Sequence, residues 1–141
     1  MELYVGGAWQ GKLEYVLKKY KKERAAGYRQ DIECVKESEP SVAQGESCCR
    51  DDMKEADIIN HFHIFVRREL EAGRELGGFV NWLYGVNPDV IIICDEVGSG
   101  IIPADKNERD YRESVGRLLC EAAGLSEHME RITGGIGMKI K

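Results

Sequence analysis

The sequence lacks a long apolar run and an excess of positive charge. Its longest uninterrupted apolar stretch is residues 90–94, whereas a membrane-spanning helix needs about 20 apolar residues. Lys and Arg number 20 against 25 Asp and Glu, which gives a net charge of −5. A chain without a basic balance has no general electrostatic attraction to nucleic acid. We therefore expect no membrane span and no nucleic-acid partner.

The sequence also lacks a paired zinc motif, because the spacing of its five cysteines and three histidines matches none. Three of the five cysteines, Cys34, Cys48 and Cys49, come before His61 and His63. The first residues of the chain lack the basic and apolar regions of a secretory signal. We therefore predict no zinc site and expect a cytoplasmic protein whose cysteines stay reduced.

The overall composition is that of a folded domain. Hydrophobic residues make up 43% of the 141 residues and charged residues 32%, which is enough apolar material to offset the entropy lost on folding. The length is close to the commonest size of one domain. We expect one domain that covers residues 1–141.

Near the start of the chain, a strand, a glycine turn and a helix are predicted in succession. A short apolar segment at residues 4–5 runs into Gly6. Apolar residues then recur at helical spacing, which predicts a helix from Lys12 to a glycine end at Gly27. The lysines on the opposite side of this helix, predicted to be solvated, are Lys18, Lys19, Lys21 and Lys22.

Helices and strands continue to alternate along the rest of the chain. Residues 90–94 form a β-branched run typical of a strand buried on both faces of a parallel sheet. Ile58 and Ile59 fit either a helix or the end of a buried strand, and the polar segment 37–47 is predicted as turns. This order predicts an α/β fold with a mostly parallel sheet flanked by helices. The remaining predicted elements are strands at residues 32–35 and 136–140 and helices at 56–71, 76–83 and between Pro103 and Gly124.

The segment between the first strand and the first helix fits the phosphate-binding pattern GxxxxGK. In this pattern backbone N–H groups wrap phosphate oxygens, the start of the helix adds partial positive charge, and the lysine reaches the outer phosphates. The next position normally carries a hydroxyl ligand for Mg²⁺, which Leu13 cannot replace. The predicted nucleotide-binding residues are Gly6, Gly7, Ala8, Trp9, Gln10, Gly11, Lys12 and Leu13.

Two acids, Asp95 and Glu96, follow the buried strand at residues 90–94. An apolar strand that ends in acids resembles a Walker B element, which holds Mg²⁺ beside bound phosphates. Because the carboxyl ends of parallel strands share one edge of a sheet, both acids are expected near the phosphate-binding loop. We predict Asp95 and Glu96 as metal-binding residues.

The segment after this strand resembles a known family. Residues 95–103, with the sequence DEVGSGIIP, are similar to the NEVGxGIVP signature of the CobU family. Residues 109–113 are similar to its RxYRD segment, and residues 135–141 to its closing GxPxxLK. This family comprises the bifunctional adenosylcobinamide kinase and adenosylcobinamide-phosphate guanylyltransferase.

The resemblance implies a P-loop NTPase-like (RecA-like) fold and a role in cobalamin biosynthesis. The activity it implies is phosphorylation of the adenosylcobinamide hydroxyl by GTP or ATP with Mg²⁺, and then GMP transfer through a histidine. It also implies a homo-oligomer, a trimer. By position in the family's motifs, the implied catalytic residues are Lys12, Glu96, Arg109 and Arg112.

The sequence departs from the family's pattern in two places. Between the first helix and Ala56 there is no counterpart of the segment HHxxRRPxxW, whose histidine accepts GMP, so phosphoryl transfer is favoured over guanylyl transfer. Asn60 stands where the family has a metal-associated aspartate, and Asp95 where it has an asparagine. We interpret this exchange as a carboxylate moved from one strand end to another.

His61 and His63 lie in an apolar run, and we interpret them as structural residues rather than nucleophiles. Three functions stay open. The chain is a kinase of the CobU type, a binding or regulatory module that has kept the fold without catalysis, or a kinase for another small alcohol.

Overall fold

The computed structural model describes residues 1–27, 39–98 and 103–141. A six-stranded sheet has the strand order β2-β3-β4-β1-β5-β6, in which the last pair is antiparallel and the other pairs are parallel. This arrangement confirms the predicted α/β fold with a mostly parallel sheet. The strands are β1 (Glu2–Gly6), β2 (Val42–Gln44), β3 (Ile58–Asn60), β4 (Ile91–Asp95), β5 (His128–Thr133) and β6 (Ile136–Lys139). The helices are α1 (Lys12–Gly27), α2 (Asp52–Glu55), α3 (Phe62–Glu71), α4 (Phe79–Val86) and α5 (Lys106–Leu125).

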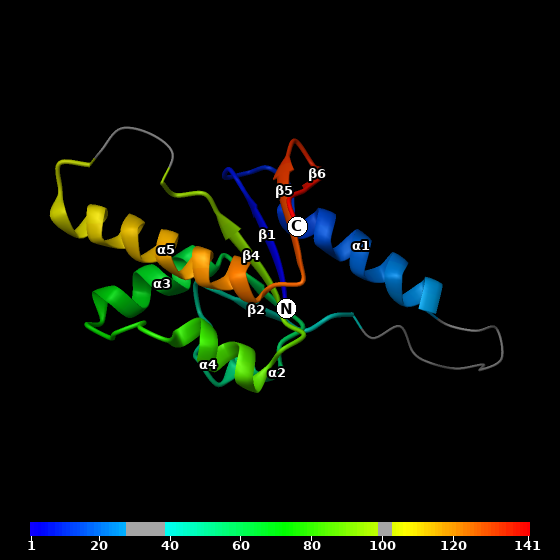
Figure 1. Ribbon diagram of the computed structural model, residues 1–141, viewed down its shortest axis with the longest axis horizontal. Coiled ribbons are helices and arrows are strands. Elements are labelled where there is room, and N and C mark those ends of the chain that lie inside the picture. The colour runs from blue at the N-terminus through cyan, green and yellow to red at the C-terminus, as the bar shows by residue number, and fades with distance from the viewer. Residues whose placement is uncertain (28–38, 99–102) are drawn as a thin grey trace.

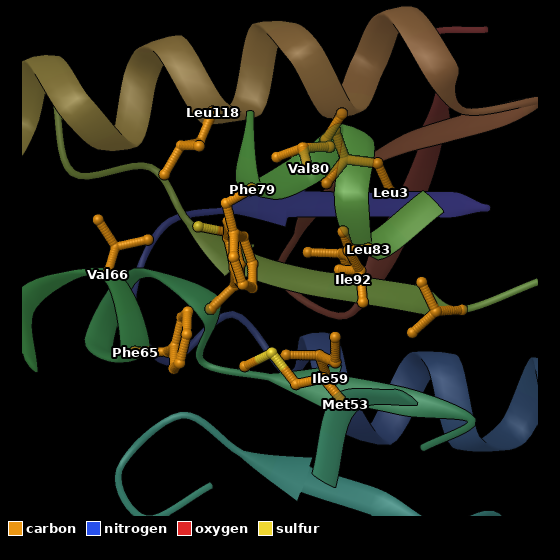
Figure 2. Packing of buried hydrophobic residues seen from close by; sticks show 14 of the residues in the cluster. Leu3, Met53, Ile59, Phe65, Val66, Phe79, Val80, Leu83, Ile92 and Leu118 are labelled. Carbon is orange, nitrogen blue, oxygen red and sulfur yellow. The ribbon is translucent and has the colours of Figure 1, made fainter. Parts of the chain in front are cut away.

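Helices cover both faces of the sheet (Figure 1). Helix α1 packs on one face, where its apolar side meets Tyr4, Ile58 and Ile93. Helices α3, α4 and α5 pack on the other face, and Figure 2 shows Leu3 and Ile92 of the sheet among their apolar side chains. Neighbouring residues in the central strands β1, β3 and β4 therefore face different helices, as the alternation of side chains along a strand requires.

Several predicted elements are confirmed, and two segments differ from their prediction. Residues 56–71 form the strand β3 and the helix α3 rather than one helix, so the strand alternative for Ile58 and Ile59 is right. The turn-rich segment at 37–47 contains β2, which is only three residues long. Strand β5 has no counterpart among the predicted elements, and the strand predicted at 32–35 lies outside the described residues.

The sheet topology places the carboxyl ends of three parallel strands at one edge. Strands β1, β3 and β4 are parallel, so their carboxyl ends meet where α1 begins. This is the edge at which open α/β sheets bind ligands. None of the helices in the described ranges is long and apolar enough to cross a membrane.

Candidate functional site

The loop between β1 and α1 leaves the sheet through a tightly packed glycine. A Cβ atom at Gly6 would lie 2.3 Å from the carbonyl oxygen of Ile132 in the neighbouring strand. Gly11, with a φ of +74°, takes the left-handed conformation that lets the chain turn into α1. The glycines of the predicted phosphate-binding pattern therefore stand where the backbone geometry excludes or disfavours a side chain.

The same loop is fastened to the turn between β5 and β6. The backbone N–H of Gly135 donates to the Gln10 carbonyl oxygen at 2.9 Å, and that of Gly134 donates to Gln10 Oε1 at 2.5 Å. Figure 1 shows this turn beside the start of α1. The loop is thus held in place by the far end of the chain.

Lys12 is the first residue of α1 and is buried, with 6% of its surface exposed. Its Nζ atom donates to the Gly7 carbonyl oxygen at 2.7 Å and lies 2.6 Å from Oδ1 of Asp95. Asp95 is the last residue of β4. The structure therefore brings together two of the predicted site residues, the lysine of the loop and the first acid after the buried strand.

Asp95 and Asn60 lie on the same face of the sheet. By alternation, Asp95 shares its face with Ile93, and Asn60 shares its face with Ile58, both of which pack on the α1 side. Asn60 Nδ2 donates to Oε1 of Gln44, the last residue of β2, at 2.8 Å. Polar groups thus line the carboxyl ends of three adjacent strands beneath the start of α1.

Two histidines at the start of α3 complete this edge. His63 Nδ1 accepts the backbone N–H of Asp95 at 3.3 Å, and its Nε2 lies 3.8 Å from Asp95 Oδ2. Burial lowers the pKa of His63, while the charge of Asp95 opposes that change. The acceptor role of Nδ1 indicates a neutral ring with its proton on Nε2.

His61 occupies a left-handed conformation, with φ of 52°, and its Nδ1 contacts the Glu46 carboxylate. The turn that carries Glu46 must come close, because a Cβ at Gly45 would lie 2.1 Å from the carbonyl oxygen of His61. The rings of His61 and His63 meet edge to face, 5.7 Å apart. The pair therefore joins the β2 turn to Asp95.

These residues line a cavity of about 400 Å³, within the range of small-molecule sites. The predicted loop contributes its residues from Ala8 to Leu13 to the lining. The lining residues that the sequence did not point to as site residues are Glu14, Glu46, Asn60, His61, His63 and Ile64. Only the resemblance drew attention to Asn60, and the apolar run around the histidines favoured a structural role for them.

The other predicted site residues lie outside the described lining of this cavity. Glu96 Oε2 accepts from Arg131 Nη2 at 2.8 Å, on the side of the sheet opposite Asp95. Arg109 donates to the carbonyl oxygens of Pro103 and Ala104, at the start of α5. Arg112 Nε lies 3.6 Å from Glu108 Oε1 on the same helix.

The donor set fits a magnesium ion that arrives with phosphates. Within the described ranges no three His, Cys, Asp or Glu side chains are grouped to hold a metal by themselves. Mg²⁺ needs fewer protein ligands, because it is usually bound by one or two carboxylates together with phosphates and water. Asp95 supplies a carboxylate and Asn60 an amide oxygen at the edge of the cavity, whereas Leu13 supplies none.

Comparison with known proteins gives concordant matches. A family model described as cobinamide kinase / cobinamide phosphate guanyltransferase matches residues 17–140. The bifunctional adenosylcobalamin biosynthesis proteins CobU of Salmonella typhimurium and Escherichia coli are each 35% identical to this chain over 52 residues. These alignments cover 37% of this chain and 29% of each relative. The family match begins at residue 17, beyond the loop at residues 6–13. The glycine loop and Lys12 are therefore observations that do not depend on the family match.

Proposed function

Because this chain belongs to the cobinamide kinase / cobinamide phosphate guanyltransferase family, we propose that it is a nucleotide-dependent kinase of cobalamin biosynthesis. It binds Mg-GTP or Mg-ATP on a P-loop NTPase-like, RecA-like fold. It transfers the terminal phosphoryl group to the hydroxyl of a cobinamide. Phosphoryl transfer is favoured over guanylyl transfer, since the sequence has no match to the family's histidine segment.

One observation carries this proposal: Lys12 is buried at the junction of a glycine loop and a helix, beside Asp95 and an open cavity. A phosphate-binding loop needs a lysine at this position to reach the outer phosphates. The ion pair with Asp95 holds the Lys12 side chain in the lining of the cavity. A lysine that served only to contact solvent would not be buried in the first turn of a helix.

The chain's own residues bring about transfer by positioning and charge neutralisation. The backbone N–H groups of the loop and of the first turn of α1 hold phosphate oxygens. When phosphates are bound, the Nζ of Lys12 would exchange the Gly7 carbonyl oxygen for the outer phosphates, and the Asp95 carboxylate would be free to donate an oxygen to a metal ion. Asp95 and Asn60 would hold Mg²⁺, and the ion would supply positive charge to the phosphate oxygens.

Glu96, Arg109 and Arg112 stay predictions as catalytic residues. Each would have to leave its present contact to reach the cavity: Glu96 its ion pair with Arg131, and Arg109 its hydrogen bonds at the start of α5. Arg131 and α5 would then have to rearrange around the nucleotide. The distance of these groups from the cavity is a reason to assay them separately from Lys12.

A second function is favoured by Leu13, which stands in place of the hydroxyl residue. Leu13 packs against the apolar cluster under α1, and its side chain has no oxygen for Mg²⁺. This substitution is compatible with a module that binds nucleotide without turning it over. This alternative keeps the nucleotide site and removes the reaction.

The test is a calorimetric titration with Mg-GTP and Mg-ATP of the unaltered chain, Lys12→Ala and Lys18→Ala. Lys18 lies on the same helix, but it is exposed and pairs with Glu14, so it controls for the loss of an α1 lysine. We expect Lys12→Ala to weaken binding at least about 100-fold and Lys18→Ala to leave it unchanged. Thermal unfolding of each variant checks that the fold persists.

Turnover then separates the two functions. Phosphorylation of cobinamide by the unaltered chain supports the kinase, and binding without turnover supports the module. Failure of the unaltered chain to bind either nucleotide at millimolar concentration would overturn both.

A further inference from the structure

One aromatic side chain of the cavity lining, that of Trp9, is covered by none of the residues in the described ranges. Trp9 lines the cavity and is 100% exposed. The other tryptophan, Trp82, packs against the core. Large aromatic side chains gain free energy when they leave water, so a Trp that no other part of the fold covers is available for a ligand.

The backbone at Trp9 is strained. Its φ of 61° lies in the left-handed region. Gly, Asn and Asp adopt this region most readily, and bulky residues rarely do. Within the described residues, the only other non-glycine residue with a positive φ is His61, which lines the same cavity. Strained residues persist where the surrounding structure holds them, and they concentrate at functional sites.

The contacts that hold Trp9 in place come from its neighbour in the loop. Gln10 is bound through both its backbone and its side-chain oxygen to the turn at Gly134 and Gly135, and Gly11 follows in a left-handed conformation. The indole ring is therefore presented at the cavity mouth by an anchored segment rather than by a free loop tip.

The place of Trp9 in the loop indicates which substrate it meets. The loop and Lys12 hold the phosphate end of the nucleotide, and Trp9 lies only three residues before Lys12. The base of a nucleoside triphosphate is separated from the terminal phosphate by the ribose and two other phosphates. Because Trp9 and Lys12 line the same cavity, a ring on this loop is nearer to the phosphate end, and to the molecule that receives the phosphoryl group, than to the base.

We propose that Trp9 is a positioning residue that binds the conjugated, apolar surface of the acceptor substrate, on the premise of the kinase function proposed above. An indole ring favours contact with a large conjugated ring, and the corrin macrocycle of a cobinamide contains one between its polar amide side chains. Ile64 and His61 line the same cavity from the start of α3. Contact with Trp9 would hold the acceptor in place while the acceptor's hydroxyl group reaches the terminal phosphate of the nucleotide.

The experiment compares Trp9→Gly and Trp9→Phe with the unaltered chain and with Tyr84→Ala. Glycine removes the ring and also relieves the left-handed backbone, so Trp9→Gly should keep or raise the unfolding midpoint. Tyr84 is a partly exposed aromatic on α4 outside the cavity lining, and it controls for the loss of a surface ring. Calorimetry gives Kd for Mg-GTP, and for cobinamide in the presence of Mg²⁺ and a non-hydrolysable GTP analogue. Steady-state assays give kcat and each KM.

We expect Trp9→Gly to weaken cobinamide binding about tenfold more than nucleotide binding, with the loss in KM for cobinamide rather than in kcat. Trp9→Phe should recover most of the affinity, and Tyr84→Ala should match the unaltered chain. Equal losses for the two ligands, or a loss for nucleotide alone, would overturn the role of Trp9 while leaving the kinase function intact. If the unaltered chain binds nucleotide but not cobinamide, the proposed acceptor is wrong, and the inference about Trp9 fails with it.

Discussion

Helix α1 carries two lysines that each face a carboxylate of the sheet, and their surroundings differ. Lys12 lies 2.6 Å from Asp95 at the carboxyl edge of the sheet, and Lys19 lies 2.8 Å from Glu130 of β5. Both pairs are on the α1 face. One borders a cavity, and the other is enclosed by hydrogen-bonding neighbours.

The pair of Lys19 and Glu130 is saturated with partners. Lys19 Nζ also donates to the Tyr4 hydroxyl at 2.7 Å, and Glu130 accepts from the Tyr15 hydroxyl at 2.6 Å and contacts His128 at 2.5 Å. Burial by itself raises the pKa of Glu130, but the hydrogen bonds from Lys19, Tyr15 and His128 outweigh it and bring the pKa to about 2. Each of these groups therefore already has a hydrogen-bonding contact within the fold.

The pair of Lys12 and Asp95 is arranged differently. Lys12 has a backbone carbonyl as its second partner, and Asp95 has a neutral imidazole 3.8 Å away. A phosphate offers Lys12 a better partner than a carbonyl, because both ions are charged. The same chemical pair is therefore structural where it is saturated and available for a ligand where it borders a cavity.

The largest expected effect is on stability when either lysine becomes methionine. Lys19→Met leaves the buried Glu130 carboxylate without its cation and should cost about 3 kcal/mol. Lys12→Met should cost about 1.5 kcal/mol, since water in the cavity can solvate Asp95. Urea unfolding at pH 7 measures both changes. Equal losses would contradict the distinction between the two pairs.

Acid should lower the free energy of unfolding by protonating Glu130 of the saturated pair. Its pKa in the folded state is about 2, below the value of 4.5 for an unperturbed glutamate, so the folded state favours the ionised form. The stability that this provides is present above about pH 4.5 and is lost as pH falls toward 2, and it amounts to about 2–3 kcal/mol. Glu130→Gln should flatten the dependence of unfolding free energy on pH across this window. An unchanged slope in the variant would rule out Glu130 as its source.

Adding a methyl group should also separate the two regions. A Cβ at Gly137 would lie 2.2 Å from both Glu130 Oε2 and the Tyr15 hydroxyl oxygen, so Gly137→Ala should cost about 2 kcal/mol. At Gly7, in the cavity loop, the nearest atom would be Gln10 Cγ at 3.5 Å, and Gly7→Ala should cost less than about 0.5 kcal/mol.

Gly116→Ala is the matched control for these two variants. Gly116 lies within α5, and a Cβ there would meet nothing within 4 Å, so alanine should stabilise the helix by about 0.5–1 kcal/mol. Thermal unfolding ranks the three variants. A loss at Gly7 as large as that at Gly137 would show that the cavity loop is packed as tightly as the saturated pair.

The two pairs were not equally predictable from the sequence. Lys12 and Asp95 each follow from a local pattern, a glycine loop before a helix and acids after a buried strand. The parallel strand order that brings them to one edge is confirmed. The prediction of a solvated face is wrong for Lys19, because its partner Glu130 lies on β5, a strand whose sequence HMERIT has no strong apolar signal.

The cavity wall formed by Glu46 and His61 could not be read from the sequence for a similar reason. Glu46 follows a strand of three residues, too short for a periodic pattern. Its contact with His61 depends on the pairing of β2 with β3 and on the close approach at Gly45. Pairings between segments far apart in the chain leave no local signal at either residue.

The smallest expected effect tests how far the cavity pair is adapted to Mg²⁺. Leu13→Thr restores a hydroxyl at the position after Lys12, and it should raise the affinity for Mg-GTP about threefold to tenfold while affinity without Mg²⁺ stays the same. Leu17→Thr is the control, because Leu17 lies one turn further along α1 and packs against the same apolar cluster. Both variants should lose similar stability through the lost packing. Since only position 13 lines the cavity, an equal gain at both positions would exclude a direct contact with the metal. No gain at position 13 would mean that Asp95 and Asn60 already satisfy the ion without a hydroxyl, and that the carboxylate at the end of β4 compensates for Leu13.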